Sequence, residues 1–175
     1  MELLSTFLSF YNFSCAEFCD QHNHPFLLAV NPEGDQSESF LLQTAELIPS
    51  RDPLLRSSEG FRIDYSSDLP VYRVKKKMGT PFASRITIGR LETSDIVLQD
   101  GTVSKLHAYF TLEKDGYHLN DAKSRNGTRL NDAKLEPGES RVVSYGDVIR
   151  VGLFSLRYVA SETIYEAMQR IVIST

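Results

Sequence analysis

The chain has 175 residues, of which 41% are hydrophobic, and a formal net charge of −4. This length suits one domain with an extension or a small subdomain. No apolar run approaches the roughly 18 residues of a membrane-spanning helix. Residues 1–14 contain no lysine or arginine, so a secretory leader is not expected. We therefore expect a cytoplasmic protein without a membrane partner.

The acidic residues are concentrated in the first part of the chain. Residues 1–70 hold 11 acidic side chains against three arginines, whereas residues 71–175 hold 16 basic against 12 acidic ones. A mildly basic domain behind an acidic segment favours an anionic ligand at one end and argues against nucleic acid as a partner. The tripeptide Lys75–Lys77 is too short for a nucleic-acid surface, and we interpret it as the solvated end of a strand.

The first 70 residues predict a helix followed by short strands. Apolar residues from Leu4 to Phe18 recur at steps of three and four, which is typical of one amphipathic helix. Pro25 is expected to end it, because proline disfavours helical geometry in the residue before it. The expected elements are a helix at 3–21, strands at 26–30 and 61–65, a strand or short helix at 40–48, and a linker at 49–60.

The two cysteines, Cys15 and Cys19, are four residues apart, so on a helix they share a face. This spacing does not indicate a disulfide framework. With His22 and His24 they could form a zinc site of the pattern C-x3-C-x2-H-x-H. Cys15 also fits the apolar stripe of the helix, and we favour that interpretation. We expect no metal and no cofactor.

From residue 71 onward, short alternating segments are separated by turns such as Asp115-Gly116. Many short strands with frequent turns predict an all-β fold of the β-sandwich type. A helix with one apolar face is expected after Ala160. The expected strands are 71–77, 84–89, 95–98, 107–113, 117–121, 128–130, 141–143, 147–151 and 154–160.

Three polar clusters lie where predicted strands turn over into loops. Guanidinium, hydroxyl and amide groups in them are hydrogen-bond donors that suit a phosphate dianion with its three acceptor oxygens. The clusters therefore indicate a phosphate site. They are Gly89-Arg90, the run from Ser104 through Lys105 to His107, and Ser124-Arg125-Asn126-Gly127.

The order Gly-Arg, Ser-x-x-His, Asn-Gly and then Gly146–Gly152 resembles the forkhead-associated (FHA) domain family over about residues 71–160. The resemblance implies an FHA-type β-sandwich of about eleven strands with its ligand loops at one end. It implies a non-catalytic module that binds phosphothreonine peptides in cytoplasmic Ser/Thr-kinase signalling. The expected parts are an acidic helix-and-strand extension of unknown role (1–70), the FHA domain (71–160) and a C-terminal helix (161–175).

The same resemblance implies which residues hold the phosphate. Arg90 would bind two phosphate oxygens with its planar guanidinium. Ser104 would donate its hydroxyl to the phosphate. Lys105 would assist through its backbone N–H and add charge at the rim of the site.

The resemblance further implies which residues hold and orient the peptide. Asn126 would bond the ligand main chain beside the phosphothreonine. Arg125 stands where the family often has a small polar residue, and its guanidinium would reach the phosphate or a downstream acidic residue. Gly89, His107 and Gly127 would support the site without touching the ligand.

Other interpretations stay open at this stage. Ser104 and His107 could belong to a catalytic triad, but no positioned acid or oxyanion hole is identifiable, so no enzyme is expected. The chain could instead be a phosphate-independent interaction or sensory module that self-associates or regulates a linked catalytic domain. Thr44 has an aliphatic residue three places later, so a phosphorylated N-terminal arm could bind its own domain or a second copy; alternatively Thr44 is buried in a strand. A Ser/Thr protein kinase is the expected upstream partner.

Overall fold

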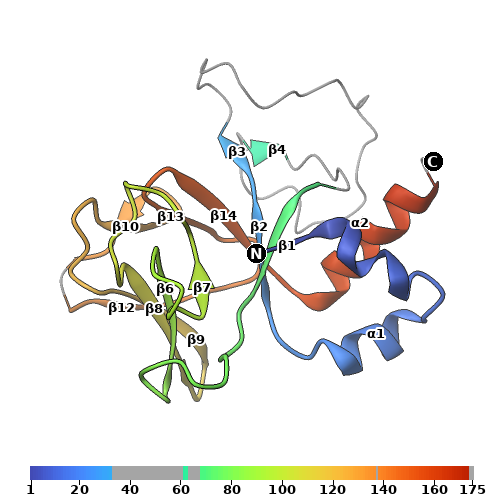
Figure 1. The fold of residues 1–175 in the computed structure, drawn as a ribbon, viewed down its shortest axis with the longest axis horizontal. Helices are drawn as coiled ribbons and strands as arrows, with labels where there is room; N and C mark the ends of the chain where they lie inside the picture. Colours follow the sequence, from blue (N-terminus) through green and yellow to red (C-terminus); the bar gives the residue numbers. More distant parts are fainter. Residues whose placement is uncertain (33–60, 63–67, 137, 174–175) are drawn as a thin grey trace.

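The computed structural model describes residues 1–32, 61–62, 68–136 and 138–173. The segment 40–48, the linker 49–60 and Thr44 lie outside these residues. Two large β-sheets form the body of the described chain, and the helices gather on one side of them (Figure 1). The expected β-sandwich with a short C-terminal helix is therefore confirmed.

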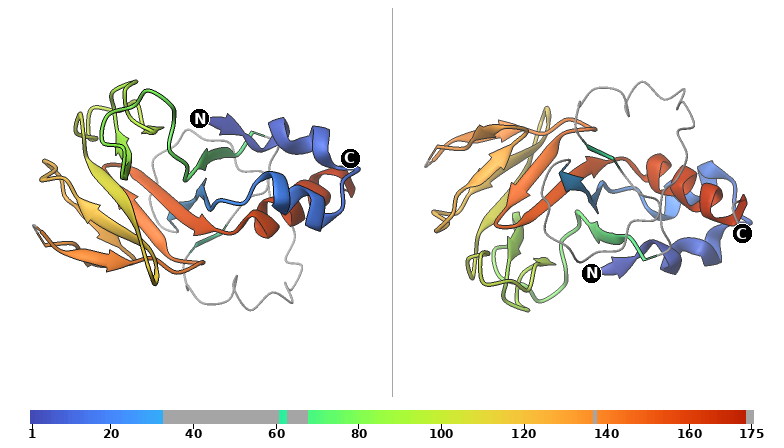
Figure 2. Two further views of the ribbon diagram at one scale, coloured as in Figure 1. Left: turned by 90° about the horizontal axis from the view of Figure 1, so that it is seen from below. Right: turned by 90° about the horizontal axis from the view of Figure 1, so that it is seen from above.

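The larger sheet has seven strands and the smaller has five. Figure 2 shows the strands on one side of the molecule and the helices on the other. The order in the larger sheet is β1 (Glu2–Leu3), β5 (Pro70–Arg73), β2 (Phe26–Ala29), β14 (Phe154–Val159), β13 (Val148–Val151), β10 (Thr128–Leu130) and β11 (Ala133–Lys134). The order in the smaller sheet is β12 (Ser140–Val142), β9 (Gly116–Asp121), β8 (Ala108–Glu113), β6 (Arg85–Gly89) and β7 (Ile96–Val97). A separate pair joins β3 (Asn31–Pro32) to β4 (Phe61–Arg62).

The core between the sheets is built from side chains that alternate along the strands. Ile88 and Phe110 of the smaller sheet meet Ile149 and Leu156 of the larger one, and all four are fully buried. Burial of each such side chain stabilises the fold by about 1.5–3 kcal/mol. This core fixes the strand ends from which the polar loops emerge.

Strand β2 is apolar on both faces because both faces are covered. Leu27 points into the core between the sheets, whereas Phe26 and Leu28 point into a second core beneath the helices. A strand buried on both faces is expected to be a continuous apolar run. β2 lies between β5 and β14, so the larger sheet joins residues on both sides of residue 70. The proposed boundary at residue 70 stays a prediction.

The prediction of a single helix over residues 3–21 is wrong. The segment forms a 3-10 helix, η1 (Leu4–Phe10), and a separate short helix, α1 (Cys15–Gln21). Ser14 starts α1 through a capping box, in which the Ser14 hydroxyl accepts from the Glu17 N–H and the Glu17 carboxylate accepts from the Ser14 N–H. The periodic pattern continues across the break because both helices pack on one core.

The two cysteines do share a face of α1, with their Sγ atoms 3.8 Å apart. Burial raises the pKa of the Cys19 thiol to about 11, so this thiol is a weak nucleophile at neutral pH. His22, which was considered as a zinc ligand, has its Nδ1 atom 3.1 Å from an Arg73 guanidinium nitrogen.

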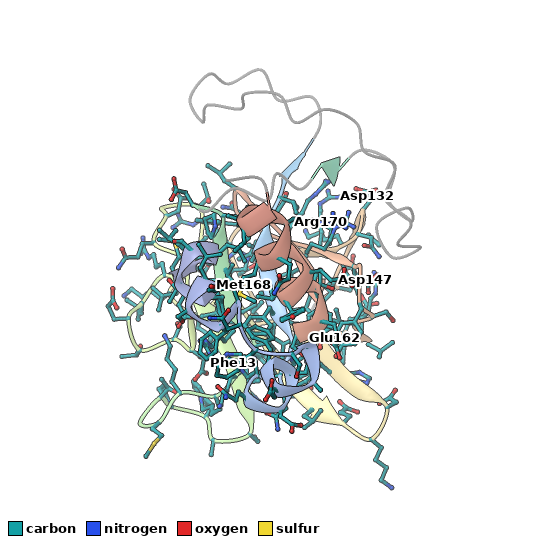
Figure 3. All side chains as sticks on the ribbon, turned by 90° about the vertical axis from the view of Figure 1, so that its right-hand side faces the viewer. Phe13, Asp132, Asp147, Glu162, Met168 and Arg170 are labelled. Atoms are coloured by element: carbon teal, nitrogen blue, oxygen red, sulfur yellow. The ribbon has the colours of Figure 1, made fainter. Side chains whose placement is uncertain are left out.

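Helix α2 (Ser161–Ile173) closes the helical layer, which faces the viewer in Figure 3. Its residues Ile164 and Met168 are fully buried in the second core, as the predicted apolar face requires. The Tyr165 hydroxyl donates to the Phe13 carbonyl at 2.9 Å, so α2 also holds the turn between η1 and α1.

Candidate functional site

Three loops at one end of the smaller sheet form a depression of about 250 Å³. They follow β6, connect β7 to β8, and connect β9 to β10. Four of the residues predicted from the sequence to bind ligand line this depression, together with residues 101–103. These four are Arg90, Ser104, Lys105 and Arg125.

Gly89 allows the first two loops to approach each other. A side chain at this position would place its Cβ atom 2.2 Å from the Lys105 carbonyl oxygen and 2.9 Å from the Ser94 hydroxyl. The close approach lets the Arg90 N–H donate to the Ser104 carbonyl at 3.1 Å. Arg90 therefore leaves the strand beside Ser104.

His107 is fully buried and joins the second loop to the third. Its Nδ1 accepts from the Ser104 N–H at 3.0 Å, and its Nε2 lies 3.1 Å from the Gly127 carbonyl oxygen. Because a backbone N–H can only donate and a carbonyl can only accept, the imidazole carries its proton on Nε2. His107 thus holds the backbone on both sides of the site.

The Ser104 hydroxyl accepts a hydrogen bond from the Arg125 N–H at 3.0 Å. Its own O–H proton is therefore directed elsewhere and can be donated to a ligand. Ser104 and His107 do not form a nucleophile and base pair, because the hydroxyl bonds Arg125 and both imidazole nitrogens bond backbone groups.

Asn126 lies next to the depression and is tied to the second loop. Its side-chain amide donates to the Thr102 carbonyl at 2.7 Å, which leaves the side-chain oxygen as an acceptor. Gly127 follows with a φ of +77°, in the left-handed region where glycine is favoured. A Cβ atom there would lie 2.7 Å from Lys134 Cε, so the Lys134 side chain packs on this glycine.

Asp121 supports the third loop and was not predicted from the sequence. Its carboxylate accepts from the Ser124 N–H and hydroxyl and from the Thr128 hydroxyl. Burial would raise the pKa of Asp121, but these hydrogen bonds outweigh it and lower the pKa below its usual value. Ser124 lies three residues after Asp121 and Thr128 lies seven after it, so Asp121 ties the start of the third loop to β10.

Asp95 was also missed, and it anchors the loop after β5. Its buried carboxylate accepts from Thr87, Thr80, the Lys77 N–H and the Lys76 ammonium, which lies 2.9 Å away. Lys76 is therefore a structural cation, and the interpretation of Lys75–Lys77 as merely a solvated strand end is wrong for it. Burial opposes ionisation, yet the hydrogen bonds lower the pKa of Asp95 to about 2.

The depression is electropositive. Two arginines and one lysine line it, and no carboxylate belongs to its lining within the described chain. Thr102, a lining residue that was not predicted, is held by Asp100, which accepts from its N–H at 2.7 Å. A serine hydroxyl and three cations together suit an oxyanion.

A cluster of potential metal ligands lies elsewhere, at the hairpin between β8 and β9. Ligand atoms of Glu113, Asp115 and His118 lie within 4.8 Å of one another. His118 Nε2 is 2.9 Å from Asp115 Oδ1, and this hydrogen bond lowers the pKa of Asp115. The hydrogen bond accounts for the closeness of these two side chains without an ion.

Residues 86–152 match the family model of the FHA domain. This part of the chain is an FHA domain. The match contains the Gly-Arg, Ser-x-x-His and Asn-Gly motifs whose side chains surround the depression. None of the described helices is long and apolar enough to cross a membrane.

Curated relatives resemble the same part of the chain. The oxoglutarate dehydrogenase inhibitor of Corynebacterium efficiens is 42% identical over 74 residues, which cover 42% of this chain and 50% of the relative. The glycogen accumulation regulator GarA of Mycobacterium tuberculosis is 44% identical over 68 residues, or 39% of this chain and 40% of the relative. The chain thus spans about half the length of these relatives, or less.

Solved structures show a weaker likeness. A chain from a structural and functional analysis of phosphothreonine-dependent FHA domain interactions is 26% identical, with a TM-score of 0.43. The alignment covers 51% of this chain and 83% of that chain. The assignment of the domain therefore rests on the family model.

Proposed function

We propose that this protein is a non-catalytic module that binds threonine-phosphorylated peptides. Arg90, Ser104 and Lys105 hold the phosphate, Arg125 adds a cation at its edge, and Asn126 bonds the peptide main chain. The site reads a phosphate through charge-assisted hydrogen bonds, which are stronger than hydrogen bonds between neutral groups.

The single observation that carries this proposal is the composition of the depression. Three cations line it beside a serine hydroxyl whose proton is available, and the described lining contains no carboxylate. Cations gathered in one place repel one another unless an anion joins them. A phosphate dianion supplies that charge and accepts several hydrogen bonds at once.

The cellular role proposed for this binding is regulatory. A Ser/Thr protein kinase would phosphorylate the partner, and binding in the cytoplasm would then control the partner's activity. Relatives named as an inhibitor and as a regulator support this role. Phosphorylation of Thr44 would create a ligand within the chain itself, so self-binding is a further form of the same function.

The test is a titration of the full chain with an oriented phosphothreonine peptide library, with phosphoserine and unphosphorylated copies as controls. The best peptide is then titrated against Arg90→Ala. We expect the variant to lose about 1.5–3 kcal/mol, the worth of a hydrogen bond to a charged group, or roughly tenfold to a hundredfold in affinity.

The matched control is Lys114→Ala, an exposed cation in the turn between β8 and β9, which should bind as wild type does. Equal binding of phosphorylated and unphosphorylated peptides would contradict the proposal and favour a phosphate-independent interaction module. Unchanged binding by Arg90→Ala would remove Arg90 from the site.

A further inference from the structure

Three cations lie side by side across the edge of the larger sheet. Arg129 of β10 is paired in register with Lys134 of β11 on one side and with Arg150 of β13 on the other. Residues directly opposite each other in a sheet project from the same face. We call Lys134, Arg129 and Arg150 the cationic row. The cationic row is not visible in the sequence, because Lys134 comes five residues after Arg129 and Arg150 comes sixteen residues after Lys134.

Asp132 is an acidic neighbour of two members of the cationic row. Asp132, labelled in Figure 3, has its carboxylate 3.2 Å from Arg150, and its carbonyl accepts from Arg129 at 2.9 Å. Within the described chain, no carboxylate forms an ion pair with Lys134 or Arg129. Like charges directly opposite each other destabilise a sheet, so the arrangement does not serve the stability of this edge.

The cationic row begins at the proposed ligand site. The Lys134 side chain packs on Gly127, with Nζ 3.5 Å from the position that a Cβ atom would take there. Gly127 follows Asn126 directly and lies two residues after Arg125, which lines the depression. The positive surface therefore continues from the depression over the third loop and onto β11, β10 and β13.

We infer that the cationic row is an extension of the peptide-binding surface that binds acidic residues of the same phosphorylated partner. This inference rests on the proposed function. The two residues from Arg125 to Gly127 span at most about 7 Å. The two strand spacings from β11 across β10 to β13 add about 10 Å. An extended peptide advances about 3.3 Å per residue, so its acidic residues lie about two to five positions from the phosphothreonine.

The experiment uses the full chain and the best phosphothreonine peptide from the library. One copy carries a run of glutamates after the phosphothreonine core, a second carries the run before it, and a third carries glutamines in both places. We expect one of the two acidic copies to bind about three- to tenfold more tightly than the glutamine copy, because exposed ion pairs each contribute little. This preference should weaken as salt is raised.

The double variant Lys134→Gln with Arg129→Gln should bind all three peptides as tightly as wild type binds the glutamine copy. Lys114→Gln is the matched control and should keep the preference. The double variant should unfold at the same temperature as wild type or higher, because it removes opposed like charges. If the double variant does not fold, Lys134→Gln alone supplies the same comparison.

Equal binding of acidic and glutamine peptides by wild type would overturn the inference and leave the proposed function intact. A preference that survives in the double variant would also overturn it. Failure of every phosphorylated peptide to bind would instead contradict the proposed function, and the extension of the surface with it.

Discussion

Replacement of Asp95 by asparagine measures what the buried anchor behind β6 contributes to stability. Its carboxylate accepts hydrogen bonds of 2.6–2.9 Å from two backbone N–H groups, two threonine hydroxyls and the Lys76 ammonium. Asparagine retains one acceptor oxygen, turns an amide group towards these donors, and leaves Lys76 without its counter-charge. Loss of one partner from a buried ion pair costs about 3–5 kcal/mol. Because the Lys76 side chain is 26% exposed, we expect the low end of that range.

The pH dependence of this loss follows from the pKa of Asp95. Burial raises it, but hydrogen bonds from Thr80, Thr87, Lys77 and Lys76 lower it from 3.8 to about 2. A carboxyl group whose pKa falls on folding stabilises the protein above its unfolded pKa, and this contribution is lost as the pH falls through its folded pKa. The shift corresponds to about 2 kcal/mol. The difference in free energy of unfolding between wild type and Asp95→Asn should therefore shrink by about that amount between about pH 4 and pH 2.

The assay is urea denaturation followed by circular dichroism, at neutral pH and at a series of acidic values. Asp20→Asn, which changes an exposed carboxylate on α1, is the control and should match wild type. The reasoning about Asp95 would be refuted by a loss below about 1 kcal/mol at neutral pH. A loss that does not vary with pH would refute it as well.

Two further predictions concern the support of the site and of the sheet. His107→Ala leaves the Ser104 N–H and the Gly127 carbonyl without partners, so the free energy of unfolding should fall by about 2–4 kcal/mol. Phosphopeptide affinity should fall with it, and wild-type values in both the denaturation and the titration would contradict the assigned role. Deletion of residues 1–30 removes β2 from between β5 and β14, and we expect loss of the folded state by circular dichroism. A truncated chain that folds and binds phosphopeptide as wild type does would show that β2 is dispensable.

The strands of the sandwich and the loops of the site follow from local pattern. Alternation of apolar and polar residues predicts β6, β8 and β14 to within a residue or so, because alternate side chains of each strand enter the core between the sheets. The clusters around Arg90, Ser104 and Asn126 lie at strand ends, where the two-residue alternation of apolar and polar side chains stops and polar turn residues begin. Short elements such as β11 carry too few residues for a pattern, and β11 was not predicted.

The N-terminal segment shows where local pattern fails. Spacing by three and four is shared by one long helix and by two short helices packed on the same core. Ser14 and Glu17 decide between them, because their capping box stabilises a helix that begins at Cys15. The apolar run of β2 likewise predicts that the strand is buried, but it does not predict which strands pair with it. These strands are β5 and β14.

The sequence by itself determined the class of fold, the ends of most strands and four of the side chains that line the depression. These features depend on residues that are close together in the sequence, so they can be predicted from local sequence patterns. The tertiary structure alone decided that Asp95 meets Lys76 across 19 positions and that His107 joins Ser104 of the second loop to Gly127 of the third. It alone aligned Lys134, Arg129 and Arg150, because the register between strands brings together residues that no local interaction connects.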